Sequence, residues 1–243
     1  MRYRFVDCRF ELGHPVRGRE LYLAGHVPGA AFLDLDTDLA DPSVEGAGRH
    51  PLPPPEVFAA AASRAGIDRS TFVVAYDQGM TGGAARLWWL LRHFGHEQAA
   101  VLRGGIGAWA GPLRAGPEQI DPGRFEPRLR ACDTIDAEGL AARLGDSRLL
   151  VLDARVPERY RGDVEPIDPV AGHIPGARNL PYTRAFEPPD DLLEAEEIVV
   201  YCGSGITACV DLLALAEAGR PDAKLYPGSW SDWSTRGLPV ERP

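Results

Sequence analysis

Short apolar runs alternate with longer amphipathic segments along the second half of this chain. The runs are rich in Val, Ile and Leu and are almost continuously apolar, which is typical of parallel strands covered by helices on both faces. We therefore predict an α/β fold with a mainly parallel sheet in this half. The predicted strands are 148–154, 177–182, 197–202 and 223–227, and the predicted helices are 136–145 and 206–219.

The two halves of the chain repeat each other. Residues 24–30 read AGHVPGA and residues 171–177 read AGHIPGA, and the apolar runs around these stretches match as well. The repeat is far longer than the roughly 20–50 residues of a solenoid unit, so we expect two copies of one domain. A stretch with several prolines and charges at 116–131 predicts a linker between a first domain at 1–115 and a second at 132–243.

Composition and charge narrow the class of protein. The 243 residues carry a formal net charge of −9, which argues against general nucleic-acid binding because that needs a basic surface. No apolar run approaches the ~18 residues of a membrane span, and the N-terminus lacks a secretory signal, so we expect a cytoplasmic protein without membrane attachment. The four cysteines show no paired spacing, and no motif implies a metal or an organic cofactor.

Cys202 ends a predicted strand and precedes a Gly-Ser-Gly sequence and a predicted helix. In an open α/β sheet, ligands bind at this end of the strands, and the amides of such a loop and helix start converge on an anion. The pattern favours a nucleophile whose thiolate, and any persulfide formed on it, is held by backbone amides. The alternative is a buried core thiol, which is the interpretation we adopt for Cys209 on the apolar helix.

The sequence CGSGITA at 202–208, together with the duplicated GHIPGA motif, resembles the two-domain rhodanese-type sulfurtransferases that use thiosulfate or 3-mercaptopyruvate. The resemblance covers nearly the whole chain and implies two tandem rhodanese-like domains. It also implies that Cys202 takes a sulfane sulfur from the donor as a persulfide and passes it to cyanide or a thiol. The loop is closer to the mercaptopyruvate branch, so 3-mercaptopyruvate is the expected donor.

The first copy has Asp77 at the position of Cys202. We therefore expect the first domain to be silent as a sulfur carrier. Asp77 is interpreted as a structural hydrogen-bond acceptor at the end of its strand.

The resemblance assigns further residues to the site. Ser204, His50 and Asp36 are expected to manage the proton balance when the donor gives up its sulfur. Arg159 is expected to bind the donor anion with two parallel hydrogen bonds, whereas Arg155 is interpreted as structural. The loop residues expected to contact the substrate are Gly203, Gly205, Ile206 and Thr207.

One position departs from the family pattern. Animal mercaptopyruvate enzymes have a second arginine in a Glu-Pro-Arg context, whereas this chain has Asp168 near that place. Arg161 or a residue of the first domain is left as the substitute, since spacing alone does not decide.

Three other functions stay as alternatives. A cysteine phosphatase is disfavoured because Ala208 stands where its Cys-x5-Arg loop needs the arginine. A non-catalytic rhodanese module that binds partners is disfavoured because Cys202 is present. A redox pair of Cys202 and Cys209 would have to bridge different turns of a helix. The expected partners are a small-molecule sulfur donor and a thiol or cyanide acceptor, and a protein acceptor is left open.

Overall fold

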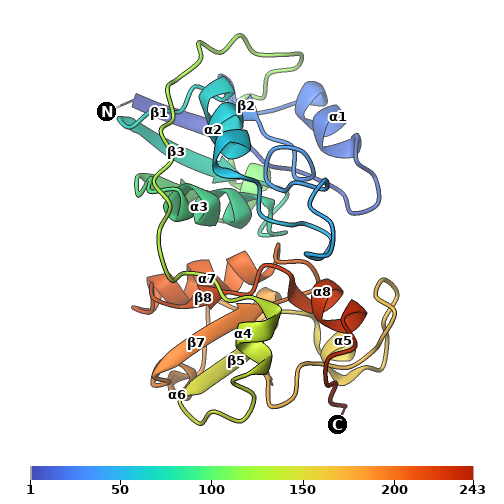
Figure 1. Ribbon diagram of the computed structural model, residues 1–243. Helices are drawn as coiled ribbons and strands as arrows, with labels where there is room; N and C mark the ends of the chain where they lie inside the picture. The colour runs from blue at the N-terminus through green and yellow to red at the C-terminus, as the bar shows by residue number, and fades with distance from the viewer. Residues whose placement is uncertain (1, 243) are drawn as a thin grey trace. The chain divides into compact units, whose positions relative to one another are not determined.

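Each half of the chain forms a four-stranded parallel sheet, and the two sheets have the same strand order (Figure 1). The order is β2-β1-β3-β4 in the first sheet and β6-β5-β7-β8 in the second. The computed structural model describes residues 2–242. The strands are β1 (Arg2–Asp7), β2 (Ala31–Phe32), β3 (Thr71–Tyr76), β4 (Ala99–Val101), β5 (Leu149–Asp153), β6 (Arg178–Asn179), β7 (Glu197–Tyr201) and β8 (Lys224–Leu225).

Helices follow the strands in both halves, as the alternating pattern predicts. Together with the repeated strand order, they confirm the tandem α/β fold expected from the sequence. The α-helices are α1 (Arg17–Ala24), α2 (Pro55–Arg64), α3 (Gly83–His93), α4 (Ala137–Ala141), α5 (Pro157–Arg161), α6 (Asp190–Leu193), α7 (Ala208–Glu217) and α8 (Ser229–Thr235). Two 3-10 helices are η1 (Gly105–Ala108) and η2 (Tyr182–Arg184).

The core of the second sheet lies on both of its faces. Val199 of β7 is fully buried in a cluster with Leu140 of α4 and Trp230 of α8. Val200, the next residue of the strand, is also fully buried and points to the opposite face, where α7 packs against β7 and β8. Burial on both faces explains why this strand has no polar alternation in the sequence.

Two elements are shorter than the sequence pattern predicts. The strand expected at 177–182 pairs regularly only through Arg178 and Asn179. Leu180 N and Tyr182 N still donate to Asp153 O (3.1 Å) and Ala154 O (3.0 Å), but the chain then turns into η2. The helix expected at 136–145 ends at Ala141, and the residues after it continue in tight turns.

The contacts within the described chain divide it into two units. Unit 1 comprises 2–41 and 52–130, and unit 2 comprises 42–51 and 131–242. The segment 42–51 therefore belongs to unit 2 although the residues on both sides of it belong to unit 1. No helix among residues 2–242 is long and apolar enough to cross a membrane.

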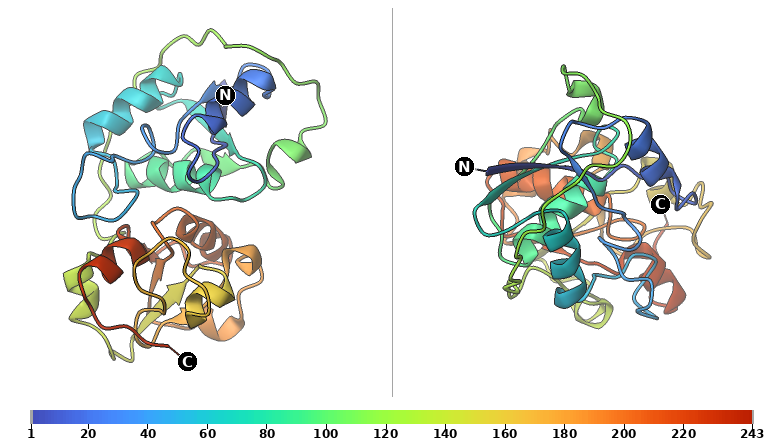
Figure 2. Two further views of the ribbon diagram at one scale, coloured as in Figure 1. Left: turned by 90° about the vertical axis from the view of Figure 1, so that its right-hand side faces the viewer. Right: turned by 90° about the horizontal axis from the view of Figure 1, so that it is seen from above.

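The stretch between η1 and α4 contains no helix and no strand (Figure 2). Its backbone is nevertheless hydrogen-bonded to unit 1, where Arg128 N donates to Phe94 O (2.9 Å) and Arg130 N donates to His93 O (2.7 Å). These bonds attach much of the proline-containing segment to unit 1.

The repeat extends to buried side chains. Arg9 Nη2 donates to Asp7 Oδ2 at 2.6 Å, and Arg155 Nη2 donates to Asp153 Oδ2 at the same distance. Each arginine also donates through Nε to both oxygens of its carboxylate, in the same residue spacing of two. The pairs are buried in both units, which confirms the structural interpretation of Arg155.

Candidate active site

Cys202 follows the last residue of β7, at the carboxyl end of a central strand of the second sheet. Its side chain is 1% exposed, and its Sγ accepts a hydrogen bond from Gly205 N at 3.1 Å. Gly205 has a φ of +78°, which turns this amide back toward the sulfur. The loop is therefore folded around the thiol, as the sequence predicts.

Residues at the start of α8 support the back of this loop. Cys202 N donates to Ser229 Oγ (3.1 Å), and Cys202 O accepts from Trp230 N (2.9 Å). Gly203 O accepts from Ser231 N (3.0 Å). Because these bonds use the backbone of the loop, its conformation is tied to a helix start that follows more than twenty residues later.

The corresponding loop of unit 1 contains an anion. The carboxylate of Asp77, 1% exposed, accepts from four backbone amides at 2.7–3.3 Å. This geometry confirms the interpretation of Asp77 as a structural acceptor. It also shows that the loop of this fold presents convergent amides to a negative group. The donors are Gly79, Met80, Gly82 and Ala84.

Ser204 lies two residues after Cys202 and is bonded to His50. Ser204 Oγ and His50 Nδ1 are 2.7 Å apart, and both side chains are largely buried, with 8% and 7% of each residue exposed. The structure thus joins two of the three residues expected to handle protons. This hydroxyl and imidazole can exchange a proton next to the thiol.

His50 reaches the loop because the segment 42–51 is anchored to the region of α8. Arg49 N donates to Ser231 Oγ (3.1 Å), and Gly46 O accepts from Arg236 Nη2 (3.1 Å). Gly48 has a φ of +84°, and a Cβ built on it would lie 2.5 Å from Gly228 O. Only glycine fits this close approach of two backbones.

Arg159 lies on α5 and borders the same loop. A Cβ built on Gly203 would lie 3.2 Å from Arg159 Nη1, which places this guanidinium beside the residue that follows the thiol. Arg159 also donates to Glu165 (2.7 Å) and to Asp168 (3.0 Å). Burial raises the pKa of Glu165, but its hydrogen bonds with Arg159 and with the Asp168 amide outweigh burial, so the pKa of this carboxyl lies below its usual value.

Sequence reasoning did not identify Arg49 as part of the site. Its side chain is 29% exposed, and its Nη1 donates to Asp168 Oδ1, while the other oxygen of Asp168 accepts from Arg159. The one signal in the sequence is its position directly before His50, in the motif RHPLP.

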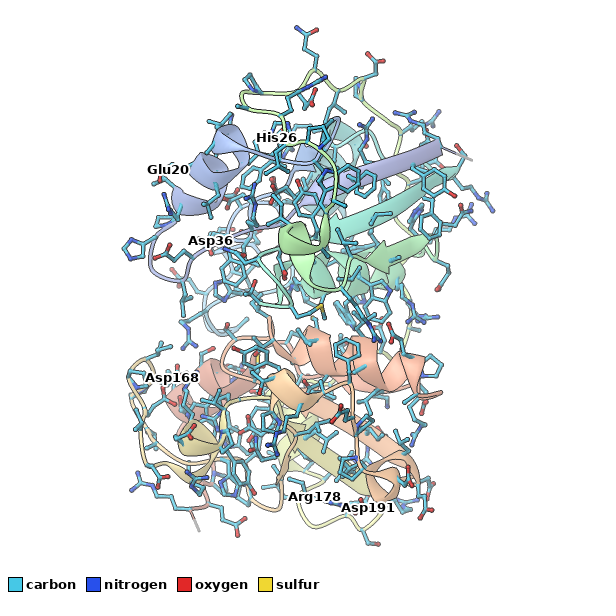
Figure 3. The ribbon with its side chains drawn as sticks, turned by 180° about the vertical axis from the view of Figure 1, so that it is seen from behind. Glu20, His26, Asp36, Asp168, Arg178 and Asp191 are labelled. Carbon is cyan, nitrogen blue, oxygen red and sulfur yellow. The ribbon has the colours of Figure 1, made fainter. Side chains whose placement is uncertain are left out.

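The remaining predicted residues are placed as follows. Ile206 is buried and Thr207 is partly exposed, and both stand between the loop and α7. Asp36 is half-buried in unit 1, where its amide donates to Asp34 Oδ1 (3.0 Å), and its role in proton transfer stays a prediction. Figure 3 labels Asp36 in unit 1 and Asp168 in the stretch of unit 2 between α5 and β6.

Two other groups lie on α7. Cys209 is buried, and its Sγ donates to Gly205 O at 3.4 Å. Within residues 2–242, neither Cys202 nor Cys209 forms a disulfide bond. Asp211 is fully buried, and neither carboxylate oxygen has a hydrogen-bond partner. Burial, followed by the neighbouring Cys202 and Asp153, raises the pKa of Asp211 well above its ordinary value.

No group of three or more His, Cys, Asp or Glu side chains within 2–242 is arranged to hold a metal ion. The geometry instead gathers a thiol, a hydroxyl–imidazole pair and two guanidinium groups around one loop. This set can bind a small anion and attack it with sulfur.

Comparisons with known proteins agree with this geometry. The model of the rhodanese-like domain family matches residues 2–112 and 136–236. A protein of Pseudomonas aeruginosa named a probable 3-mercaptopyruvate sulfurtransferase is 44% identical, over 95% of this chain and 88% of its own length. A candidate thiosulfate sulfurtransferase of Mycobacterium tuberculosis, SseB, is 39% identical, over 95% of this chain and 87% of its own.

A solved structure matches the whole fold. The crystal structure of SseA from Escherichia coli, described as that of a 3-mercaptopyruvate sulfotransferase with the rhodanese fold, superimposes with a TM-score of 0.80 at 33% identity. The match covers 94% of this chain and 93% of that chain.

Proposed function

The chain belongs to the family of rhodanese-like domains, and from that premise we propose that it is a sulfurtransferase that uses 3-mercaptopyruvate as donor and Cys202 as sulfur carrier. The observation that carries the proposal is Cys202 inside an amide loop, with the Ser204–His50 pair beside it. Unit 1 holds Asp77 at the equivalent position and contributes no nucleophile there.

In the first step, the Cys202 thiolate attacks the sulfur of the donor. An S–S bond forms and the C–S bond of 3-mercaptopyruvate breaks, with the bonding pair leaving on the carbon as the pyruvate enolate. The proton of the donor thiol is taken up by the Ser204–His50 pair and returned to that carbon, which gives pyruvate. Cys202 is left as a persulfide, whose negative charge the Gly205 amide can stabilise.

In the second step, a thiophilic acceptor attacks the outer sulfur of the persulfide. The S–S bond breaks, its electron pair returns to Cys202 as thiolate, and the acceptor leaves with the sulfur. With cyanide, the product is thiocyanate, and with a thiol, it is a new persulfide. No metal or redox cofactor is needed to balance either step.

Ser204 and His50 are the reason for proposing 3-mercaptopyruvate as the donor. Thiosulfate carries no proton on its outer sulfur and leaves as sulfite, so it needs no proton transfer, whereas 3-mercaptopyruvate does. The Ser204–His50 pair, whose Oγ and Nδ1 atoms are 2.7 Å apart, therefore assists the reaction of 3-mercaptopyruvate and is not needed for that of thiosulfate. One of the two relatives is named for 3-mercaptopyruvate and the other for thiosulfate, so thiosulfate stays the second candidate donor.

The test is mass spectrometry of the protein after incubation with 3-mercaptopyruvate and no acceptor. We expect the native chain to gain the mass of one sulfur on the peptide that contains Cys202, and Cys202→Ser to gain none. Sulfur transfer by the Cys202→Ser variant at the native rate contradicts the mechanism. A strong preference for thiosulfate in steady-state rates contradicts only the choice of donor.

The other functions considered have less support. A phosphatase loop needs an arginine at position 208, where α7 begins with Ala208. A redox pair is not favoured because the Cys209 thiol is directed to the Gly205 carbonyl. A cytoplasmic location, a small-molecule acceptor and the absence of nucleic-acid or membrane partners stay predictions from the sequence.

A further inference from the structure

A cavity of about 380 Å³ lies at the amino ends of β3 and β4 in unit 1. It is lined by residues 68–70 before β3, by residues 94–96 between α3 and β4, and by four residues of the segment 124–128. Asp77 follows β3 at the other end of that strand. The cavity therefore lies at the opposite end of β3 from the amide loop of unit 1.

The segment 124–128 is fixed against the turn before β4. Arg128 N donates to Phe94 O at 2.9 Å. Gly95 has a φ of +83°, and a Cβ built on it would lie 2.8 Å from Arg128 O, so only glycine allows the two backbones to approach this closely. One wall of the cavity is therefore held by the backbone of unit 1.

The internal repeat shows the same corner of the fold in a second form. After both α3 and α7 the chain reaches a glycine with positive φ, and the residue after this glycine donates its amide to a carbonyl of the last helical turn. In unit 1 this residue is His96, whose N donates to Leu91 O at 2.7 Å. In unit 2 it is Arg220, whose N donates to Leu215 O at 2.8 Å. His96 and Arg220 therefore occupy equivalent positions.

Arg220 closes this corner in unit 2. Its Nη1 donates to Leu193 O at 2.7 Å and to Ala195 O at 2.6 Å. Counted back from the first residue after the strand, these two positions match Asp68 and Ser70 of unit 1, which line the cavity. A histidine has no guanidinium to place there, so the corner that is filled in unit 2 is left as a cavity in unit 1.

The unpaired charges of the cavity are positive. Arg69 and Arg128 line it and are exposed, and neither side chain has a hydrogen bond or an ion pair within residues 2–242. The two carboxylates of the lining, Asp68 and Glu126, are each paired with an arginine, at 3.4 Å and 3.0 Å. An anion suits two unpaired guanidinium groups, since each can donate parallel hydrogen bonds to a carboxylate or a phosphate.

The inner lining of the cavity is buried and largely aromatic. Phe94 and Phe125 are 2% and 7% exposed, and His96 is 6% exposed. Burial is the main reason that the pKa of His96 is lowered, which favours the neutral ring. His96 Nε2 is buried without a hydrogen-bond partner within residues 2–242. Buried polar atoms in proteins are nearly always hydrogen-bonded, so this nitrogen indicates that a ligand completes the site.

We propose that this cavity binds a small organic anion, whose charged group is held by Arg69 and Arg128 and whose apolar ring lies beside Phe94 and Phe125. Its volume is in the range of small-molecule sites, roughly 300–1,000 Å³, and such sites combine an apolar lining with a few polar groups. The site is independent of the proposed sulfur transfer, because it belongs to unit 1 and uses no residue of the Cys202 loop.

The test is a calorimetric titration of the native chain with phenyl phosphate, which joins one anionic group to one apolar ring. We expect a Kd of about 1 mM or below, and roughly 10-fold weaker binding of inorganic phosphate, which lacks the ring. Arg69→Gln and Arg128→Gln should each raise the Kd roughly 10- to 100-fold, because each removes hydrogen bonds between charged groups. Both side chains are exposed, so these variants should fold as the native chain does.

Two further variants separate loss of the site from loss of one positive charge. Arg19→Gln is the matched control, because Arg19 is an exposed arginine of unit 1 that lies on α1 and does not line the cavity. The Kd of this variant should equal that of the native chain. His96→Arg should abolish binding, since an arginine at this position can close the corner as Arg220 does in unit 2.

The histidine ring signals in an NMR titration locate the bound anion. We expect the signal of His96, identified as the one absent from His96→Arg, to shift with phenyl phosphate and to saturate. A shift confined to His50, which is bonded to Ser204 of the Cys202 loop, places the anion there and overturns the proposal. It is also overturned by the absence of saturable binding up to about 10 mM, or by equal Kd values for Arg69→Gln, Arg128→Gln and the native chain.

Discussion

Asp77 and Cys202 occupy the same position in two copies of one loop. Asp77 Oδ1 accepts from the amide of the third residue after it at 2.7 Å, and Cys202 Sγ does the same at 3.1 Å. The donor residues, Met80 and Gly205, both have positive φ, at +64° and +78°. The duplicated fold therefore offers its amides to a carboxylate in one unit and to a sulfur in the other.

Removing the carboxylate in unit 1 should lower stability without affecting catalysis. Asp77→Ala leaves four buried amides without their acceptor, and we expect a loss of about 3 kcal/mol in the free energy of unfolding. Asp77→Asn keeps one acceptor oxygen and should lose less. Denaturant unfolding measures both, and persulfide formation on Cys202 serves as the control. An unchanged midpoint for Asp77→Ala would show that these bonds contribute no net stability.

The Ser204–His50 pair should matter for one donor only. For Ser204→Ala and His50→Gln, we expect kcat with 3-mercaptopyruvate to fall by about 10²-fold, because general acid–base assistance is lost. The rate with thiosulfate should be retained, since that donor transfers no proton. The double variant should be little worse than either single one, because the residues act as a unit. Equal losses with both donors would contradict a role in proton transfer.

Gly48 should be required to bring His50 to the loop. A methyl group at this position would lie 2.5 Å from Gly228 O, so Gly48→Ala should displace the segment 42–51. We expect at least a 10-fold fall in kcat with 3-mercaptopyruvate. Gly46→Ala is the control, because Gly46 also has a positive φ, of +73°, but a Cβ there meets no atom within 4 Å. If the two variants behave alike, backbone strain rather than the close contact is responsible.

Asp211 should make the protein less stable as the pH rises. Its pKa in the folded chain is raised well above its ordinary value, chiefly by burial, so between the unfolded and the folded pKa the folded state retains a proton that the unfolded state has released. Stability from this group is therefore fully present below the unfolded pKa of about 3.9 and falls by up to about 1.4 kcal/mol per pH unit above it, until the pH reaches the folded pKa.

The measurement is denaturant unfolding of the native chain and Asp211→Asn between pH 4 and 8. We expect the variant to gain stability relative to the native chain as the pH increases, because asparagine cannot ionise. A constant difference across this range would show that Asp211 does not titrate differently in the two states.

Much of the fold follows from local patterns and from the repeat. Continuous apolar runs such as 197–202 require burial on both faces, and the Gly-Ser-Gly sequence after Cys202 permits the turn that aims an amide at the sulfur. Element ends were less predictable, since the regular pairing of the edge strand β6 ends at Asn179 although the predicted strand continues to Tyr182. The length of an edge strand depends on the one strand beside it, which local sequence does not record. The limits of the linker at 116–131 stay a prediction.

The sequence by itself determined the tandem α/β fold, and it predicts Cys202 as the nucleophile and a first copy that is silent at Asp77, because each of these depends on residues close together in the chain. Only the tertiary structure brought Arg49 to Asp168, a partner 119 positions away, and Ser204 to His50, 154 positions away. Such pairs depend on where the segment 42–51 packs, and this is decided by the close approach of Gly48 and by bonds to α8. No periodicity records those contacts, since they join loops whose register is set only by packing.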